Sequence, residues 1–466
     1  MIKSKKMHIA PRVSLLGLLL LLHACTVVGP DYVRPTIDVP TKFKEASNAS
    51  TFDEKSAGIQ SGAAWWSIYA DTELDKLMLQ IEQRNYSLQT YAAKVRQAQA
   101  LAAIAQAEKL PNVVLGGTND FGIRVNWELD LWGRIQRNIE SNNANVEATL
   151  ADLNAAKLSL QAQLAQNYFL LRAKDADLVR LDEMTNAYEK LLKITRNQYA
   201  VGVSDKGSIA QAQAQFATAQ AQAQDARITR QQLEHAIAVL IGKAPADFSI
   251  AMAPLANSVP TIPANLPSEL LQRRADIIAA ERRMLVANAR IGAAEASKYP
   301  KFDIAAGVSV RKGGLGGLRL AAPIYSGAPN APREKAEADF DEDVASYRQT
   351  VLTSLLEVED NLAAQNILTQ AYIAQDLAAS SSRQAAQIAQ NQYQAGILTY
   401  QAMLEVKAAN LTNERAALAL QGRRLLASVA LVKALGGTWQ TSTSSSSDQA
   451  NPKQTDKRSE NEVGKL

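Results

Sequence analysis

Few side chains in this sequence have the types and spacing that catalysis or metal binding requires. The 466 residues include one cysteine, Cys25, and three histidines, and only His235 lies beyond the N-terminal leader, so no transition-metal ligand set is available. The glycines at 313–317 are not followed by Lys-Ser/Thr and indicate a hairpin turn, not a phosphate-binding loop. Acidic pairs on the helices have the spacing of surface residues, without a Ser/His/Asp arrangement. We predict that the protein is not an enzyme and needs no cofactor.

Cys25 is more informative as a site of covalent modification. It follows a lysine-rich start and the apolar run 15–22, which is too short to span a bilayer and is typical of a secretory signal. Residues 22–25 resemble the lipobox of bacterial lipoproteins. The resemblance implies removal of residues 1–24 and lipid attachment to Cys25, and Thr26 favours sorting to the outer membrane. The alternative is an ordinary signal peptide with an incidental cysteine.

The composition favours a helical protein. Hydrophobic residues make up 47% of the chain but aromatic residues only 6%, and the apolar share is mostly Ala and Leu, which favour helices. The net charge of +4 arises from 50 basic and 46 acidic residues, and no basic patch is interleaved with aromatic side chains. We therefore predict a mainly α protein with a small β part and no nucleic-acid partner.

The chain contains one unit twice. Residues 197–203 match residues 391–397 at an offset of 194, and each copy predicts a helix, two strands, a very long helix, a turn and another helix. Residues 135–199 contain neither Pro nor Gly, and about 65 helical residues would extend roughly 100 Å. The predicted organisation is a lipoprotein signal peptide (1–24), a lipid-anchored extended arm (25–64), a first repeat (65–245), a linker (246–267), a second repeat (268–440) and a disordered polar tail (441–466).

Two segments alternate between apolar and polar residues with the period of a strand. They cover residues 121–131 and 302–311, and strands of about 9–11 residues can cross a bilayer at a tilt. We expect the apolar faces to contact lipid and the polar residues to line the interior of a barrel: Arg124, Asn126, Glu128, Asp130, Asp303 and Arg311. Capping and pairing at the junction between barrel and helix is an equal alternative for Glu128 and Asp130.

Four strands per chain cannot close a membrane barrel, because the smallest such barrels have eight. No segment holds about 20 uninterrupted apolar residues, so a further membrane crossing would require a closed barrel. Several copies must then contribute strands, and three copies would give 12. Only Asn119-Asp120 separates the strand that begins at residue 121 from the strand before it, so we expect little or no extracellular gate, or else a shorter barrel.

Several motifs together resemble one family. Residues 127–134 closely resemble the strand-to-helix passage of TolC-type outer-membrane efflux proteins, and more narrowly that of their lipid-anchored, OprM/NodT-like branch. Other matching motifs are residues 28–32, Trp65-Trp66, residues 274–277 and the Tyr-x-x-Gly turns at Tyr199 and Tyr393. The resemblance covers residues 22–440.

The resemblance implies a homotrimer in the outer membrane of a Gram-negative bacterium, lipid-anchored and extending into the periplasm. Its fold would be a trimeric 12-stranded transmembrane β-barrel continued by a long periplasmic α-helical barrel. A periplasmic adaptor (membrane fusion) protein and an inner-membrane RND-type transporter would complete a tripartite efflux system.

The resemblance also implies roles for the two periplasmic turns. Matched residue by residue, the gate is Glu405 with Gln401 one helical turn earlier, and three Glu405 carboxylates around an axis would repel each other and favour cations. The competing interpretation is that Glu405 is a solvated position near Lys407. The candidate adaptor contacts are Tyr199, Gly202, Asp205, Lys206, Tyr393 and Gly396, for which an exposed polar turn is the alternative.

The predicted function is a passive duct from periplasm to exterior for drugs or other small molecules. The same duct could serve a type I protein secretion system instead. A periplasmic coiled-coil adaptor is a third alternative, but adaptors carry one helical hairpin, and the duplicated unit argues against it.

Overall fold

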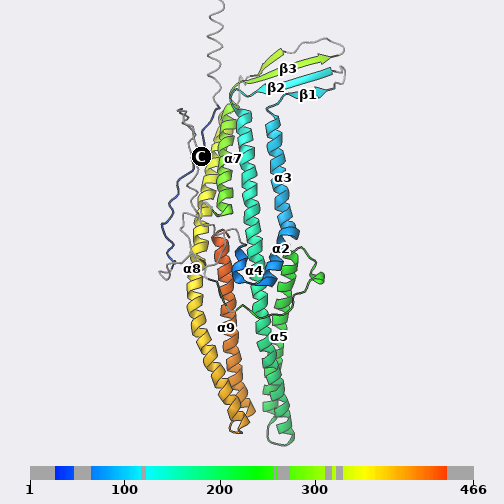
Figure 1. The fold of residues 1–466 in the computed structure, drawn as a ribbon, viewed down its shortest axis with the longest axis vertical. Helices are drawn as coiled ribbons and strands as arrows, with labels where there is room; N and C mark the ends of the chain where they lie inside the picture. The colour runs from blue at the N-terminus through cyan, green and yellow to red at the C-terminus, as the bar shows by residue number, and fades with distance from the viewer. Residues whose placement is uncertain are drawn as a thin grey trace, which may run out of the picture.

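The computed structural model describes residues 27–46, 64–116, 122–256, 258–260, 262, 273–309, 317–321 and 329–437. Cys25, Arg311 and the Asn119-Asp120 connection lie outside these residues, so the predictions made on them remain predictions. The described chain is an elongated bundle of helices with a small sheet at one end (Figure 1). A predicted helical rod with a minor β part is therefore confirmed.

The duplication predicted from the sequence is present in the order of elements. The first unit contains α3 (Tyr86–Ala107), β1 (Asn112–Leu115), β2 (Gly122–Leu129), α4 (Arg134–Ala200) and α5 (Lys206–Leu240). The second contains α7 (Ala275–Ala296), β3 (Lys301–Ser309), β4 (Gly317–Ala321), α8 (Ala331–Gln394) and α9 (Tyr400–Ala434). Three short elements complete the described fold, namely η2 (Trp65–Tyr69), α2 (Thr72–Arg84) and η3 (Pro245–Asp247).

Helix α4 is the central element of the bundle. Its 67 residues extend about 100 Å, and it contacts α3 and α7 near the sheet and α5 and α9 toward the other end. Six of its buried residues are alanine, and such small side chains let neighbouring helices approach closely. A Cβ added to Gly422 of α9 would lie 3.2 Å from the Cβ of Ala173 of α4, so the two helices are in tight contact there.

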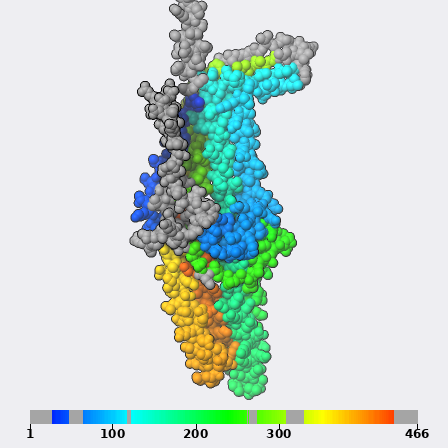
Figure 2. Space-filling view, in the orientation of Figure 1, coloured from blue at the N-terminus to red at the C-terminus, as the bar shows by residue number. Residues whose placement is uncertain are grey.

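The largest apolar cluster lies at mid-height. Trp65, Trp66 and Tyr69 of η2 pack with α2 against Tyr168 and Phe169 of α4, together with residues of α5 and α9. These segments form a bulge on the side of the rod (Figure 2). The bulge marks the level at which α3 and α7 give way to α5 and α9 as the neighbours of α4 (Figure 1).

The sheet is antiparallel, with the strand order β1-β2-β3-β4. Its register places apolar residues on one face across successive strands, as in the row Val113, Val125 and Ala306 and the row Trp127 and Ile304. The adjacent rows contain Asn112, Asn126 and Ala305, or Glu128 and Asp303. Since in-register residues share a face, the sheet has one apolar and one polar face.

The described strands differ in extent from the predicted ones. Within the described residues β1 has four residues, β2 eight, β3 nine and β4 five, and the residues on both sides of β4 lie outside the described chain. β2 ends at Leu129 instead of residue 131. The reason is that Asp130 leaves the strand ladder and its carboxylate accepts hydrogen bonds from the first turn of α4.

Candidate functional site

The polar residues at the end of β2 are engaged at the junction of sheet and helix. Arg134 donates from Nε and Nη2 to the two carboxylate oxygens of Glu128 at 3.0 and 2.9 Å. Asp130 accepts from the backbone N–H groups of Ile135 at 3.0 Å and Gln136 at 2.7 Å, and so caps α4. Pairing and capping, the alternative raised from the sequence, is what both carboxylates do in the structure.

The remaining candidates for a lumen lie farther along the same face. Arg124 and Asn126 are exposed on β2, and Asp303 of β3 is in register with Glu128. Arg124 lies opposite Gly307, where the absence of a side chain leaves room for the long guanidinium stem. These three residues therefore share the polar face of the sheet, although their role in a lumen remains a prediction.

Aromatic side chains surround this junction. Trp127 Nε1 donates to the carbonyl of Lys109 at 3.0 Å, and Trp132 Nε1 donates to the carbonyl of Pro300 at 2.8 Å. Trp132 also stacks on Tyr299, with the ring centroids 4.8 Å apart. Amphipathic aromatic residues of this kind are enriched where a membrane protein meets the water interface. The sequence placed Trp127 on the apolar face of a predicted strand and both tryptophans in a family motif, but it did not predict this arrangement.

The far end of the rod is formed by two equivalent turns. The N–H of Val203 donates to the backbone carbonyl of Gln198 at 2.8 Å, and the N–H of Ile397 donates to the backbone carbonyl of Gln392 at 2.9 Å. Each turn closes on a glycine in the left-handed region, Gly202 with φ of 78° and Gly396 with φ of 75°. These glycines therefore serve to end the helices, which explains the repeated Tyr-x-x-Gly motif physically.

The helices that leave these turns are capped by side chains. Asp205 accepts from the N–H of Ser208 at 2.9 Å, and this hydrogen bond holds the pKa of its carboxyl below the ordinary value. Thr399 accepts from the N–H of Ala402 at 3.2 Å at the equivalent position. Lys206 is exposed beside Asp205, and Tyr199 and Tyr393 precede the two glycines. The predicted contact residues thus surround the turns.

The tips also carry exposed apolar side chains that the sequence reasoning missed. Val201, Val203 and Ile397 are each 75% exposed, and Tyr199 is 40% exposed. The sequence could have indicated them, because all four residues lie within the heptapeptides 197–203 and 391–397 that the two repeats share. Exposed apolar side chains on a narrow tip are typical of a contact surface.

The predicted gate residues lie together on α9. Gln401 and Glu405 are exposed one helical turn apart, with Nε2 of Gln401 3.5 Å from Oε1 of Glu405. Tyr188 of α4 lies nearby, and burial, followed by the Glu405 carboxylate, raises the pKa of its hydroxyl. Among the described ion pairs none joins Glu405 to Lys407.

The opposite face of α9 fixes this segment to α4. Tyr400 Oη donates to the carbonyl of Ala187 at 3.2 Å, and Lys190 Nζ lies 5.2 Å from the centre of the Tyr400 ring. Leu404 is buried in a small cluster that includes Leu191. These contacts hold the backbone that carries Gln401 and Glu405, while the two polar side chains remain exposed.

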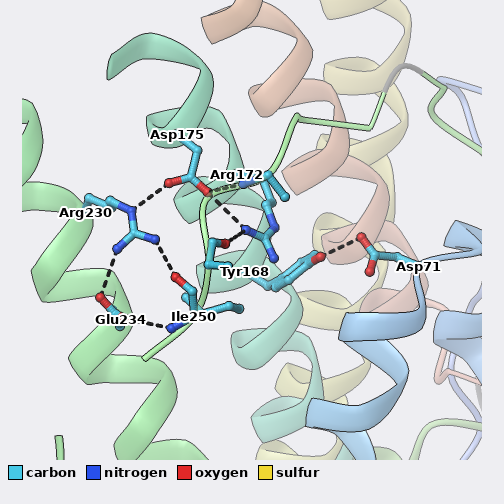
Figure 3. Close-up of polar contacts among 9 residues, drawn as sticks. Asp71, Tyr168, Arg172, Asp175, Arg230, Glu234 and Ile250 are labelled. Atoms are coloured by element: carbon cyan, nitrogen blue, oxygen red, sulfur yellow. Dashed lines mark hydrogen bonds and ion pairs between the residues drawn. The ribbon is translucent and has the colours of Figure 1, made fainter. Parts of the chain in front are cut away.

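A buried polar network lies at mid-height (Figure 3). Asp175 accepts from Arg172 at 3.0 Å and from Arg230 of α5 at 2.6 Å, and it is only 2% exposed. Arg230 also donates to Glu234 at 2.9 Å and to the carbonyl of Ile250 at 2.7 Å. The interpretation that acidic pairs on the helices are surface residues is therefore wrong for Asp175, because Arg230 of α5 and the chain after η3 cover it.

This network fastens the segment that joins the two repeats. The N–H of Ile250 donates to Glu234 at 2.6 Å, and the N–H of Ala253 donates to Asp175 at 3.2 Å. Arg172 Nη1 donates to the carbonyl of Ala251 at 2.7 Å. The segment thus has its backbone polar groups satisfied by side chains of α4 and α5 although it is neither helix nor strand.

Two further observations concern the described residues only. None of the described helices combines the length and apolar character needed to cross a membrane. Within the same part of the chain, no three His, Cys, Asp or Glu side chains gather as a metal site would require.

Comparison with known proteins identifies the family. The family model described as "Outer membrane efflux protein" matches residues 77–243 and 266–437. The chain is 26% identical to the cation efflux system protein CusC of Escherichia coli, over 90% of this chain and 97% of CusC. It is 29% identical to the pyoverdine export outer membrane protein OpmQ of Pseudomonas aeruginosa, over 81% of this chain and 88% of OpmQ.

Solved structures agree with this result. The outer-membrane channel OprN superposes with a TM-score of 0.77 at 26% identity, covering 89% of this chain and 100% of that one. The open state of the MtrE outer membrane channel of Neisseria gonorrhoeae gives a TM-score of 0.73 at 26% identity, covering 89% and 98% of the two chains. With a family model over both repeats and the same fold in solved channels, the chain belongs to the outer membrane efflux protein family.

Proposed function

We propose that three copies of this chain form a passive duct through the outer membrane, as the exit component of a tripartite efflux system. The observation that carries this proposal is a two-faced sheet at the end of a helical rod that is about 100 Å long. A sheet with an apolar and a polar face separates lipid from an aqueous interior only when it closes, and closure requires strands from other copies.

The surface of α8 supports association with a second copy. Six of its large apolar residues are at least half exposed, and at 3.6 residues per turn they fall within about one third of the helix circumference. They are Leu352, Leu356, Ile367, Ile373, Leu377 and Ile388. Large exposed apolar stripes of this kind mark interaction sites.

The opposite edge of the chain offers a complementary surface. Helices contact one another in the order α3, α4, α7, α8 near the sheet and α5, α4, α9, α8 toward the tip, so α8 is at one edge and α3 and α5 are at the other. Leu101 and Ile104 of α3 and Ile228 and Val239 of α5 are exposed there. Contact between unlike edges generates a ring when the rotation closes. A ring of three copies would have 12 strands.

The lipid on Cys25 would lie at the junction of sheet and helix. Val27 packs against Gly133, where an added Cβ would lie 2.6 Å from Val27 Cγ1, and the N–H of Val28 donates to Trp132 at 3.1 Å. Cys25 precedes Val27 by two residues, a reach of about 7 Å in extended chain. Acyl chains attached there would enter the bilayer beside the aromatic residues of the junction, which supports lipid anchoring.

The tips are the proposed contact with a periplasmic adaptor. Their exposed apolar residues surround the turns that contain Tyr199, Gly202, Asp205 and Lys206, or Tyr393 and Gly396. Gln401 and Glu405 lie just above the second turn, where a ring of three carboxylates would form the gate. An inner-membrane RND-type transporter would supply the energy, so the chain itself would need neither cofactor nor catalytic site. The proposed cargo is drugs or other small molecules.

The proposal is tested with the mature full-length protein in planar bilayers and in mild detergent. We expect single-channel conductance and a trimer by light scattering. Leu356→Glu and Ile367→Glu should prevent trimer formation without loss of helical circular dichroism. Ser346→Glu, at an exposed residue of the same helix outside the apolar stripe, should not. A wild-type monomer that forms no pore at any voltage would refute the duct.

A further inference from the structure

Residues 27–46 are fixed along the bundle although they form neither helix nor strand. They run beside α7 and α8 from the junction with the sheet to mid-height (dark blue in Figure 1). Backbone polar groups outside secondary structure need other partners when water is excluded. Here those partners are side chains and backbone groups of the helices and of the sheet–helix junction, gathered mainly at the two ends of the segment.

The upper end enters a notch made by glycine. Gly29 has φ of +104°, and a Cβ on it would lie 2.4 Å from Cα of Gly292 in α7. Arg137 of α4 is only 4% exposed and donates to the carbonyl of Gly29 at 3.1 Å. Asn288 of α7 donates to the carbonyl of Pro30 at 3.0 Å. The fit therefore depends on the absence of a side chain at both glycines and on a buried cation between them.

The lower end is held by a carboxylate. Glu359 of α8 accepts from the N–H of Lys44 at 2.7 Å and from the N–H of Glu45 at 2.9 Å, one with each oxygen. Phe43 is only 5% exposed and packs in a cluster with Tyr347 and residues of α7 and α9. The buried side chain of Phe43 and the two hydrogen bonds to Glu359 together form a second anchor for the segment.

The anchors come from both repeats. Arg137 belongs to the first repeat, whereas Asn288, Gly292 and Glu359 belong to the second. We propose that residues 27–46 are a strap that docks only once the two repeats are packed together, and that it then locks α4 to α7 and α8 between the sheet and mid-height. Arg137 and Glu359 act as positioning residues for the strap.

Limited trypsin digestion of the purified full-length protein tests the docking. Lys42 and Lys44 are exposed, but the backbone between them is held by Phe43 and Glu359, so cleavage requires release of the strap. Gly29→Ala alters only the strap itself, and Glu359→Gln alters only the lower anchor. We expect each to accelerate cleavage after Lys42 and Lys44 at least tenfold. Cleavage after Lys206 at the tip should not change, which serves as an internal control.

Two matched variants control for nonspecific effects. Val33→Ala removes a side chain of the strap that is 78% exposed, and Glu337→Gln removes a carboxylate of α8 whose ion pair is with Arg333. Both should be cleaved at the wild-type rate. Wild-type cleavage rates in Gly29→Ala and Glu359→Gln would overturn the docking.

Thermal unfolding followed by circular dichroism tests the locking. Gly29→Ala and Glu359→Gln combined should lower the melting temperature of the helical bundle, whereas the two control substitutions combined should not. Faster cleavage without a lower melting temperature would show that the segment is a passenger and would overturn the strap. Pore formation is measured separately, so a duct that fails to conduct is distinguishable from a strap that fails to lock.

Discussion

Replacing Arg230 by methionine should loosen the segment that joins the two repeats. Arg230 donates to Asp175, to Glu234 and to the carbonyl of Ile250, and its side chain is 13% exposed. Asp175 keeps Arg172 and the N–H of Ala253 after the change, and Glu234 keeps the N–H of Ile250. Breaking a buried pair outright costs about 3–5 kcal/mol. Because no carboxylate is left unpaired, we expect a smaller local loss of about 2 kcal/mol.

Hydrogen exchange measures this loss where it occurs. About 2 kcal/mol corresponds to roughly thirtyfold faster exchange of the Ile250 and Ala253 amides when exchange follows the opening equilibrium. The matched control is Arg227→Met on the same helix, because Arg227 pairs with Asp182 at 2.6 Å but both side chains are more than 40% exposed. That pair should contribute about 0–1 kcal/mol. Equal exchange in both variants, or no change in Arg230→Met, would refute the reasoning.

Three further predictions concern the tip and the strap. Glu405→Ala should raise single-channel conductance and reduce cation preference, because the proposed ring loses its carboxylates; an unchanged current and selectivity would count against the gate. Gly396→Ala should destabilise the second turn by about 1–2 kcal/mol because its φ is 75°, and the Ile397 amide should then exchange faster. Burial raises the pKa of Tyr32 to about 12, so its neutral form stabilises the fold fully below pH 10, and this contribution is lost as the pH rises through 12. Tyr32→Phe should therefore show a smaller loss of melting temperature between pH 9 and 12 than the wild type, and an equal loss would contradict this assignment.

The long helices were predictable because their sequence excludes the residues that end helices. Residues 135–199 lack Pro and Gly, and α4 occupies Arg134–Ala200. The turns were predictable for the complementary reason, since Gly202 and Gly396 adopt positive φ that other residues avoid. Local rules of this kind determined the order of elements in both repeats.

Contacts between distant segments were not predictable from spacing. Asp175 looks like a surface residue of α4, yet Arg230 and Ala253 cover it from 55 and 78 residues away. The docking of Gly29 on Arg137 spans 108 residues. Spacing in the sequence could not identify the gate residue Glu405 either. Glu405 was selected by family resemblance, because an exposed glutamate on a helix has no local feature that distinguishes a gate from an ordinary solvated position.

Helices α4 and α8 each run without interruption from the sheet to a turn at the far end. Neither helix is broken by a loop between the sheet and the tip, because each has one end at the sheet and the other at a turn. A partner that twists or presses on the turns applies torque to those rods, and a stiff helix passes the load on over about 100 Å. The strap and the mid-height network brace α4 sideways, so the same elements that stabilise the fold also determine how far mechanical work done at the tip can reach toward the membrane.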